Sequence, residues 1–134
     1  MTVEWHGPEL LAKVRQAALR GVIDGVESVI EEADSLMNDT PRDGRTYRRR
    51  GVEHVASSPG NPPAPDTGRL RKSLRSEYDP SDLSGEAIAS TEYAASLEYG
   101  SAKVAPRPFM RPALSSKKDE IAEGIRSEIS AALK

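Results

Sequence analysis

The longest regular pattern in the chain is an apolar stripe within residues 8–37. Its members recur at steps of three and four residues, the spacing of one face of an α-helix, and Pro8 suits a first turn, where no backbone N–H is needed. We therefore predict a long amphipathic helix over residues 8–37. The stripe consists of Leu11, Val14, Ala18, Val22, Val26, Val29, Ile30, Ala33 and Leu36.

Two glycines interrupt this predicted helix. Gly21 and Gly25 each cost about 1 kcal/mol relative to alanine inside a helix. A bend is the interpretation we favour from the sequence, and close approach of another backbone is the alternative.

Residues 38–68 have almost no periodicity. They hold Pro41, Pro59, Pro62, Pro63 and Pro65, and also Gly44, Gly51, Gly60 and Gly68. Structureless loops beyond about 15 residues are uncommon in compact domains and tend to be functional or disordered. Prolines also favour extended backbone. We predict a long arm that becomes ordered against another surface.

Residues 69–110 predict a small sheet between two short helices. Asp66 or Thr67 can cap a helical turn at the start. Strands are expected at Leu74–Tyr78 and Glu86–Thr91, joined by a turn. A short helix then ends at Gly100.

The last pattern predicts a helix over residues 111–134, with one apolar face formed by Leu114, Ile121, Ile125, Ile129 and Leu133. The whole chain of 134 residues is thus predicted to be one α+β domain. Its parts are a long N-terminal amphipathic helix, an extended Pro/Arg-rich loop, a small antiparallel hairpin, a short helix and a C-terminal amphipathic helix.

Charge is concentrated in blocks. Residues 1–40 hold three basic and eight acidic side chains (net -5), residues 41–75 hold nine and three (+6), and residues 76–134 hold seven and ten (-3), which sums to the overall -2. This balance argues against a uniformly basic nucleic-acid binder. The arginine block itself is either a solvated segment or a surface that meets a polyanion or an acidic partner. Its densest part is Arg42, Arg45, Arg48, Arg49 and Arg50.

Residue types that carry catalysis are scarce. The chain has no cysteine, which excludes disulfides, thiolate metal sites and a cysteine nucleophile. His6 and His54 have no partner at metal-ligand spacing, and no phosphate-binding or nucleophile-elbow motif is found. The tripeptide Asp66–Gly68 also occurs in aspartic proteases, but here it lacks flanking apolar strands. We expect no enzyme, no cofactor and no metal site.

No apolar run approaches the roughly 20 residues of a membrane span, and the N-terminal residues lack the pattern of a signal peptide. With 37% hydrophobic residues, core material is thin. We expect a small soluble intracellular protein, not associated with a membrane, that gains order from partners.

Three segments together resemble a known family. They are ASSPGNPPAPDTGRLRKSL (56–74), YAASLEYGS (93–101) and APRPFMRPAL (105–114). Their order and spacing are similar to the small neck or tail-completion proteins of long-tailed bacteriophages (siphoviruses), the minor tail-component family often compared with the lambda gpZ protein. The resemblance covers residues 40–134. It departs at Leu97 and Tyr99, where a β-branched residue and Phe are also common.

The resemblance implies a non-catalytic structural virion protein at the head–tail junction. Such a protein forms part of an oligomeric ring that joins the tail to the DNA-filled capsid and surrounds the DNA channel. The implied partners are further copies of the chain, with a hexamer as the default, together with a head-side connector or stopper ring and the tail terminator or tail tube. The protein would be made in the bacterial host cytoplasm and end in the virion.

Carried onto this chain, the resemblance implies a set of subunit or partner contacts. Within it, Glu98 is expected to pair with Arg107 or Arg111, the alternative being a plainly exposed glutamate, and Phe109 is expected to be an anchor, with core packing favoured. The arginine block would contact passing DNA non-specifically, or an acidic neighbour. The implied interface residues are Asp66, Thr67, Gly68, Arg69, Leu70, Arg71, Glu98, Tyr99, Gly100, Arg107, Phe109 and Arg111.

Two other functions stay open at this point. One is a tail terminator ring protein of the same junction. The other is a small non-catalytic nucleic-acid-binding module, favoured by Tyr47 among arginines because bases stack on such rings.

Overall fold

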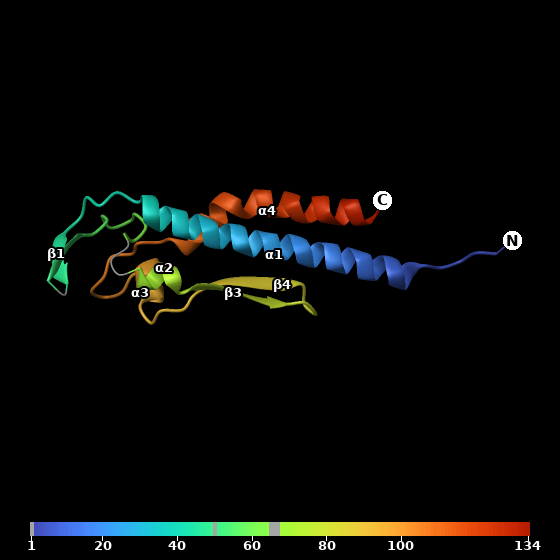
Figure 1. Cartoon of the computed structure of the whole chain (residues 1–134), viewed down its shortest axis with the longest axis horizontal. Coiled ribbons are helices and arrows are strands. Elements are labelled where there is room, and N and C mark those ends of the chain that lie inside the picture. The colour runs from blue at the N-terminus through green and yellow to red at the C-terminus, as the bar shows by residue number, and fades with distance from the viewer. Residues whose placement is uncertain (1, 50, 65–67) are drawn as a thin grey trace.

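The protein is α+β in the computed structural model, which describes residues 2–49, 51–64 and 68–134. Helix α1 (Gly7–Asp39) lies between helix α4 (Met110–Ala132) on one side and a β-hairpin on the other (Figure 1). Among the described residues, no helix is both long and apolar enough to span a bilayer. The remaining elements are β1 (Thr46–Arg49), β2 (Val52–Val55), α2 (Arg69–Lys72), β3 (Leu74–Asp79), β4 (Ser84–Ala89) and α3 (Ala94–Tyr99).

The two long helices touch at the glycines of α1. A Cβ atom placed on Gly21 would lie 2.9 Å from Cα of Ile125, and one on Gly25 would lie 2.7 Å from Cγ2 of Ile121. Side chains at these positions would separate the helices, so glycine is required here for close approach. Close approach of another helix, the alternative interpretation from the sequence, is therefore confirmed, and it accounts for both glycines without a bend.

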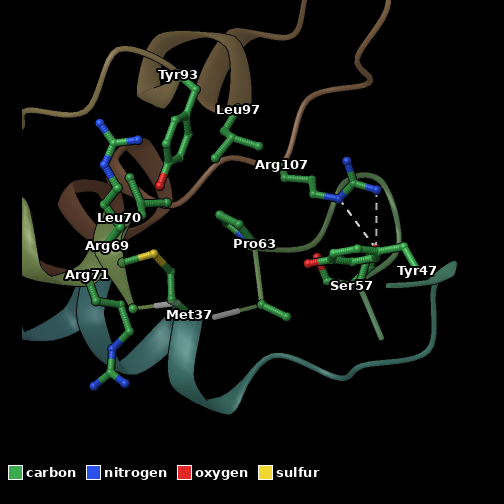
Figure 2. A pocket seen from close by; sticks show the side chains of 13 residues that line it. Met37, Tyr47, Ser57, Pro63, Arg69, Leu70, Arg71, Tyr93, Leu97 and Arg107 are labelled. Atoms are coloured by element: carbon green, nitrogen blue, oxygen red, sulfur yellow. Dashed lines mark hydrogen bonds between the residues drawn. The ribbon is translucent and has the colours of Figure 1, made fainter. Parts of the chain in front are cut away.

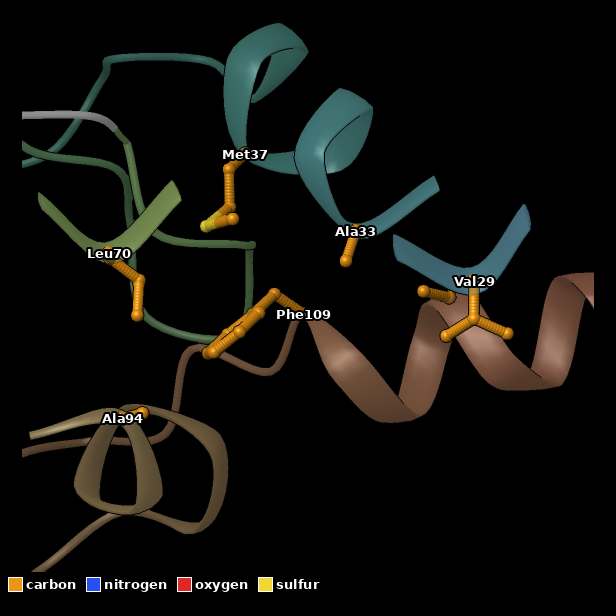
Figure 3. Packing of buried hydrophobic residues seen from close by; sticks show 7 residues of the cluster. Val29, Ala33, Met37, Leu70, Ala94 and Phe109 are labelled. Atoms are coloured by element: carbon orange, nitrogen blue, oxygen red, sulfur yellow. The ribbon is translucent and has the colours of Figure 1, made fainter. Parts of the chain in front are cut away.

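The core lies where the C-terminal half of α1 meets α2, α3 and the start of α4. Phe109 is completely buried at its centre, between Met37 and Ala33 of α1 and Leu70 of α2 (Figure 3). The rest of the cluster consists of Val29, Ala94 and Ala113. Most of these side chains are small or medium-sized, so one phenylalanine fills much of the space between four helices.

The β3–β4 hairpin packs on α1 through its second strand. Leu74 pairs with Ala89 and Asp79 with Ser84, in antiparallel register. The first strand is where the sequence predicts it, but β4 begins and ends two residues earlier than predicted. At Gly85, which pairs with Tyr78, the strand lies so close to α1 that a Cβ atom would be 2.7 Å from Cγ2 of Val26.

The predicted arm over residues 38–68 contains a second hairpin, so the expectation of a stretch without regular structure is wrong. Strands β1 and β2 pair from Thr46 with Val55 to Arg49 with Val52. The pairing extends to Gly44, whose N–H donates to the carbonyl of Ala56 at 2.8 Å. Further on, the N–H of Gly60 donates to the carbonyl of Pro106 at 2.9 Å. The described parts of the arm are therefore ordered against their own chain.

Candidate subunit interface

The three segments that carry the resemblance meet at one end of the molecule. The Gly60–Pro106 hydrogen bond joins the first to the third, and the N–H of Arg107 donates to the carbonyl of Leu97 at 2.5 Å, which joins the third to the second. We call this region the motif cluster, and it comprises the described parts of residues 56–74, 93–101 and 105–114. Asp66 and Thr67, with their predicted capping and interface roles, lie outside the described residues.

Gly68 precedes α2 with a left-handed backbone (φ 79°). Its carbonyl accepts the N–H of Lys72 at 3.0 Å. Residues with a Cβ atom rarely adopt this conformation, so glycine at this position is a requirement of the turn into α2. Gly68 thus has a structural role within its own chain, as the turn residue before α2.

Arg69 points away from the core and pairs with Glu92. Its two terminal nitrogens, Nη1 and Nη2, lie 3.0 and 2.7 Å from the two carboxylate oxygens. The guanidinium also lies 5.6 Å from the ring centre of Tyr93. Both charged side chains are more than half exposed, so the pair is a surface feature of the motif cluster that a neighbouring molecule can reach.

Arg71 ties the motif cluster to α1. Its Nε and Nη2 donate to the two carboxylate oxygens of Asp34 at 2.6 and 2.9 Å. This two-pronged geometry is the strong form of an arginine–carboxylate pair. The hydrogen bonds from Arg71 hold the pKa of Asp34 below its ordinary value.

Glu98 is buried, at 5% exposed, and it caps helix α4. Its carboxylate accepts the backbone N–H groups of Phe109 at 2.8 Å, Met110 at 3.0 Å and Arg111 at 2.8 Å. These are among the N–H groups that a helix leaves without an internal partner, and their dipoles favour a negative charge. Nε of Arg111 adds a fourth contact at 3.2 Å.

This arrangement explains the acidity of Glu98. Burial raises the pKa of the carboxyl, but the three backbone N–H groups and Arg111 lower it further than burial raises it. The pKa therefore lies below its ordinary value, and the group is a carboxylate at neutral pH. The predicted pairing with Arg111 is confirmed, and the alternative of an exposed glutamate is wrong.

Arg107 does not reach Glu98. Its Nε and Nη2 instead donate to the backbone carbonyl of Ser57 at 3.4 and 3.3 Å, as the dashed lines in Figure 2 show. This contact closes one side of a pocket of about 310 Å³. Figure 2 shows Tyr47 and Ser57 at one side of it and Tyr93 and Leu97 at the other. The pocket therefore lies between the β1–β2 hairpin and the motif cluster, and residues of both line it.

The arginine block lies on and beside the β1–β2 hairpin. Arg42, Arg45 and Arg48 are exposed. The rings of Tyr47 and His54 stack across the hairpin with their centres 5.6 Å apart. Arg49 ends β1, its side chain is outside the described part, and Arg50 lies outside the described residues altogether. The described arginines are thus exposed on and beside a two-stranded scaffold, where Asp43 and Glu53 are exposed as well.

Three residues of the implied interface are internal. Leu70, Glu98 and Phe109 are at most 9% exposed, because they fill the core or cap α4. Their contacts are within the chain, so they hold the motif cluster together and do not face a partner. Core packing of Phe109, the interpretation favoured from the sequence, is confirmed.

Tyr99 and Gly100 close α3 at the surface. Tyr99 is 67% exposed, with the Arg111 guanidinium 4.8 Å from its ring centre. Gly100 ends the helix at φ 80°. Among the described residues of the implied interface, the exposed ones are therefore Arg69, Tyr99 and Arg111.

Sequence reasoning missed the carboxylates that pair with these arginines. Asp34 and Glu92 lie 37 and 23 residues from Arg71 and Arg69, so no local spacing marks them. His6 contacts Glu4 and Glu9 near the start of the chain. Within residues 2–49, 51–64 and 68–134, no group of three or more His, Asp or Glu side chains is arranged to hold a metal ion.

The chain was compared with models of protein families, with curated proteins and with solved structures. No family model, curated protein or solved structure matches it.

Proposed function

We propose that this chain is a structural virion protein of the head–tail junction of a long-tailed bacteriophage, a neck or tail-completion subunit of the ring that joins the tail to the filled capsid. The observation that carries the proposal is the motif cluster. Three separate segments, on which the resemblance rests, contact one another, and Glu98 of one segment caps the helix that starts in another. Their spacing therefore reflects a shared structural unit.

The charge distribution supports a place beside DNA. The exposed arginines of the β1–β2 hairpin lie at one end of α1, a helix of 33 residues and so roughly 50 Å long. In a ring around the DNA channel, such a surface gains from non-specific, salt-dependent phosphate contacts. The same arginines can instead meet the acidic face of α1 in a neighbouring subunit.

The proposal includes the partners of such a protein. They are further copies of the chain in a ring, by default a hexamer, with a head-side connector or stopper ring on one side and the tail terminator or tail tube on the other. Rings of identical subunits close through head-to-tail contacts between two different surfaces of the chain.

Deletion of the gene from the phage or prophage that carries it tests the proposal. Electron microscopy of the particles should show filled heads without tails, together with free tails of normal length. Overlong tails would instead identify a tail terminator. Normal infectious particles would overturn the junction function.

Complementation of the deletion tests the basic hairpin. A variant with Arg42, Arg45 and Arg48 changed to Gln should lower the yield of infectious particles at least tenfold. The matched control changes Lys13, Lys103 and Lys134 to Gln, because these residues are also exposed and the change in net charge is equal. Equal yields from the two variants would remove the hairpin from the proposed function.

A further inference from the structure

The N-terminal end of the chain exposes apolar side chains. Val3 is 85% and Trp5 84% exposed, and Leu10 and Leu11 of the first turns of α1 are 46% and 59% exposed. Trp5 is the only tryptophan of the sequence. Its ring lies against Gly7, where a Cβ atom would overlap it. Such a concentration of exposed apolar side chains marks an interaction site.

A second apolar feature lies further along the molecule. Helix α4 and the β3–β4 hairpin both pack on α1 and leave between them an open groove of about 460 Å³. Val26 and Val29 of α1 line it, with Leu114 and Ile121 on the α4 side and Leu83 and Ala87 on the hairpin side. Leu114 is 53% exposed, so the groove presents apolar surface to solvent.

The chain cannot fill this groove with its own tryptophan. Trp5 precedes the start of α1 at Gly7 by two residues, and two extended residues reach about 7 Å. Val22, the first groove residue of α1 itself, lies fifteen residues into the helix, which is about 22 Å along its axis. An indole that enters the groove must therefore come from another molecule.

Size and charge favour a second copy of this chain as that molecule. The groove, with a volume of about 460 Å³, has room for an indole. A tryptophan side chain buries roughly 150–250 Å² of surface when it is enclosed. Glu4 and Glu9 flank Trp5 and give the segment negative charge. On the groove's α4 side, Lys118 is an exposed cation one turn beyond Leu114. Arg111 also lines the groove, and its guanidinium contacts Glu98 and the ring of Tyr99 as well.

We propose that residues 2–11 of one copy dock in the groove of the next copy, with Trp5 as the anchor. This inference rests on the proposed function, since it names the contact by which the ring would close. The segment and the groove are different surfaces of one chain, so the contact is head-to-tail and repeats from copy to copy.

The fluorescence of Trp5 tests the proposal on the full-length chain. We expect its emission to shift to the blue as the protein concentration rises, in parallel with the increase in mass measured by light scattering. Trp5→Ala should raise the apparent dissociation constant at least about 30-fold, the effect of losing an aromatic anchor at the centre of an interface.

Two glutamate substitutions on α4 provide the matched comparison. Leu114→Glu alters the groove and should abolish the blue shift, and it should weaken association as much as Trp5→Ala. Leu133→Glu alters an equally exposed leucine outside the groove lining (57% against 53% exposed) and should change the dissociation constant less than about threefold. Thermal unfolding monitored by circular dichroism checks that both variants fold.

Three results would overturn the docking. They are a monomer at every concentration, an oligomer whose Trp5 emission stays that of an exposed indole, or equal weakening by the two glutamate variants. If the protein forms an oligomer but Trp5 stays exposed, the docking is wrong and the proposed ring function is unaffected. If Trp5 docks but deletion of the gene gives normal particles, the docking is correct and the proposed function is wrong.

Discussion

The two ends of α1 are stabilised differently. At its C-terminal end, the motif cluster surrounds a fully buried phenylalanine and satisfies the start of α4 with a buried carboxylate. At its N-terminal end, Trp5, Leu10 and Leu11 are exposed. One end is complete within the chain, and the other has apolar surface that a partner can cover. The stability of the single chain should therefore depend on the first end, and its association on the second.

The largest effect should come from the centre of the motif cluster. Phe109→Ala leaves a cavity between four helices and should lower the free energy of unfolding by about 4 kcal/mol, measured by urea denaturation. Tyr99→Ala is the aromatic control. Because Tyr99 is 67% exposed and loses mainly its contact with Arg111, it should cost about 1 kcal/mol or less. Equal costs would contradict the buried position of Phe109.

The next effect should come from the cap of α4. Glu98→Gln removes the charge that accepts three backbone N–H groups and should cost about 3 kcal/mol at pH 7. Glu92→Gln alters an exposed carboxylate of the same region and should cost much less, because exposed ion pairs contribute little to stability.

The cost of Glu98→Gln should depend on pH. The pKa of Glu98 in the folded chain is lowered from its ordinary value of 4.5, so its contribution is fully present above pH 4.5 and is lost as the pH falls through the folded pKa. The difference in unfolding free energy between the wild-type chain and Glu98→Gln should therefore shrink below pH 4.5. A difference that stays constant down to pH 2 would show that the charge is not what stabilises the cap.

A smaller change in the free energy of unfolding is expected where α1 and α4 touch. Gly21→Ala gains helix propensity of about 1 kcal/mol, but its Cβ atom would lie 2.9 Å from the backbone of Ile125, and such overpacking costs about 1–3 kcal/mol. We expect a net loss of about 1 kcal/mol. Gly124→Ala is the control in α4, since a Cβ atom there meets no described atom within 4 Å. It should raise the unfolding free energy by up to about 1 kcal/mol.

The smallest effect should come from the open end. Leu11 is 59% exposed, so Leu11→Ser should change the unfolding free energy of the dilute monomer by no more than about 0.5 kcal/mol. Urea denaturation at a concentration where light scattering shows a single chain measures this. A loss as large as that of Glu98→Gln would mean that the N-terminal end also stabilises the monomer, and the comparison between the ends would fail.

The parts of the fold that could be predicted are those with local signals. The apolar stripes predicted both long helices to within two residues at each end, and the Leu74 strand and the helix before Gly100 also follow from local patterns. The β1–β2 hairpin could not be found in this way, because Arg48 and Arg49 occupy the second half of β1 and hide the alternation that marks a strand.

Long-range contacts explain the rest of the differences. The pairing of Glu98 with Arg111 was within reach of sequence reasoning, but its role as the cap of α4 depends on how the chain turns between Gly100 and Phe109. The reason for a glycine at position 21 is the contact with Ile125, which is more than 100 residues away in the sequence. The exposure of Trp5 is likewise a property of the assembled chain, since an isolated tryptophan in a sequence is expected in a core as readily as at a surface.

The cap at Glu98 also determines where changes of chain length can be accepted. It fixes the first residue of α4, and that start places Ile121 and Ile125 opposite the two glycines of α1. An insertion within residues 101–105, which are exposed apart from Val104, precedes α4 and does not change the register of the helix itself. One extra residue between Arg111 and Ile121 would rotate the rest of α4 by about 100° and turn other side chains toward the glycines. Length variation is thus compatible with the loop before the cap and incompatible with the helix after it.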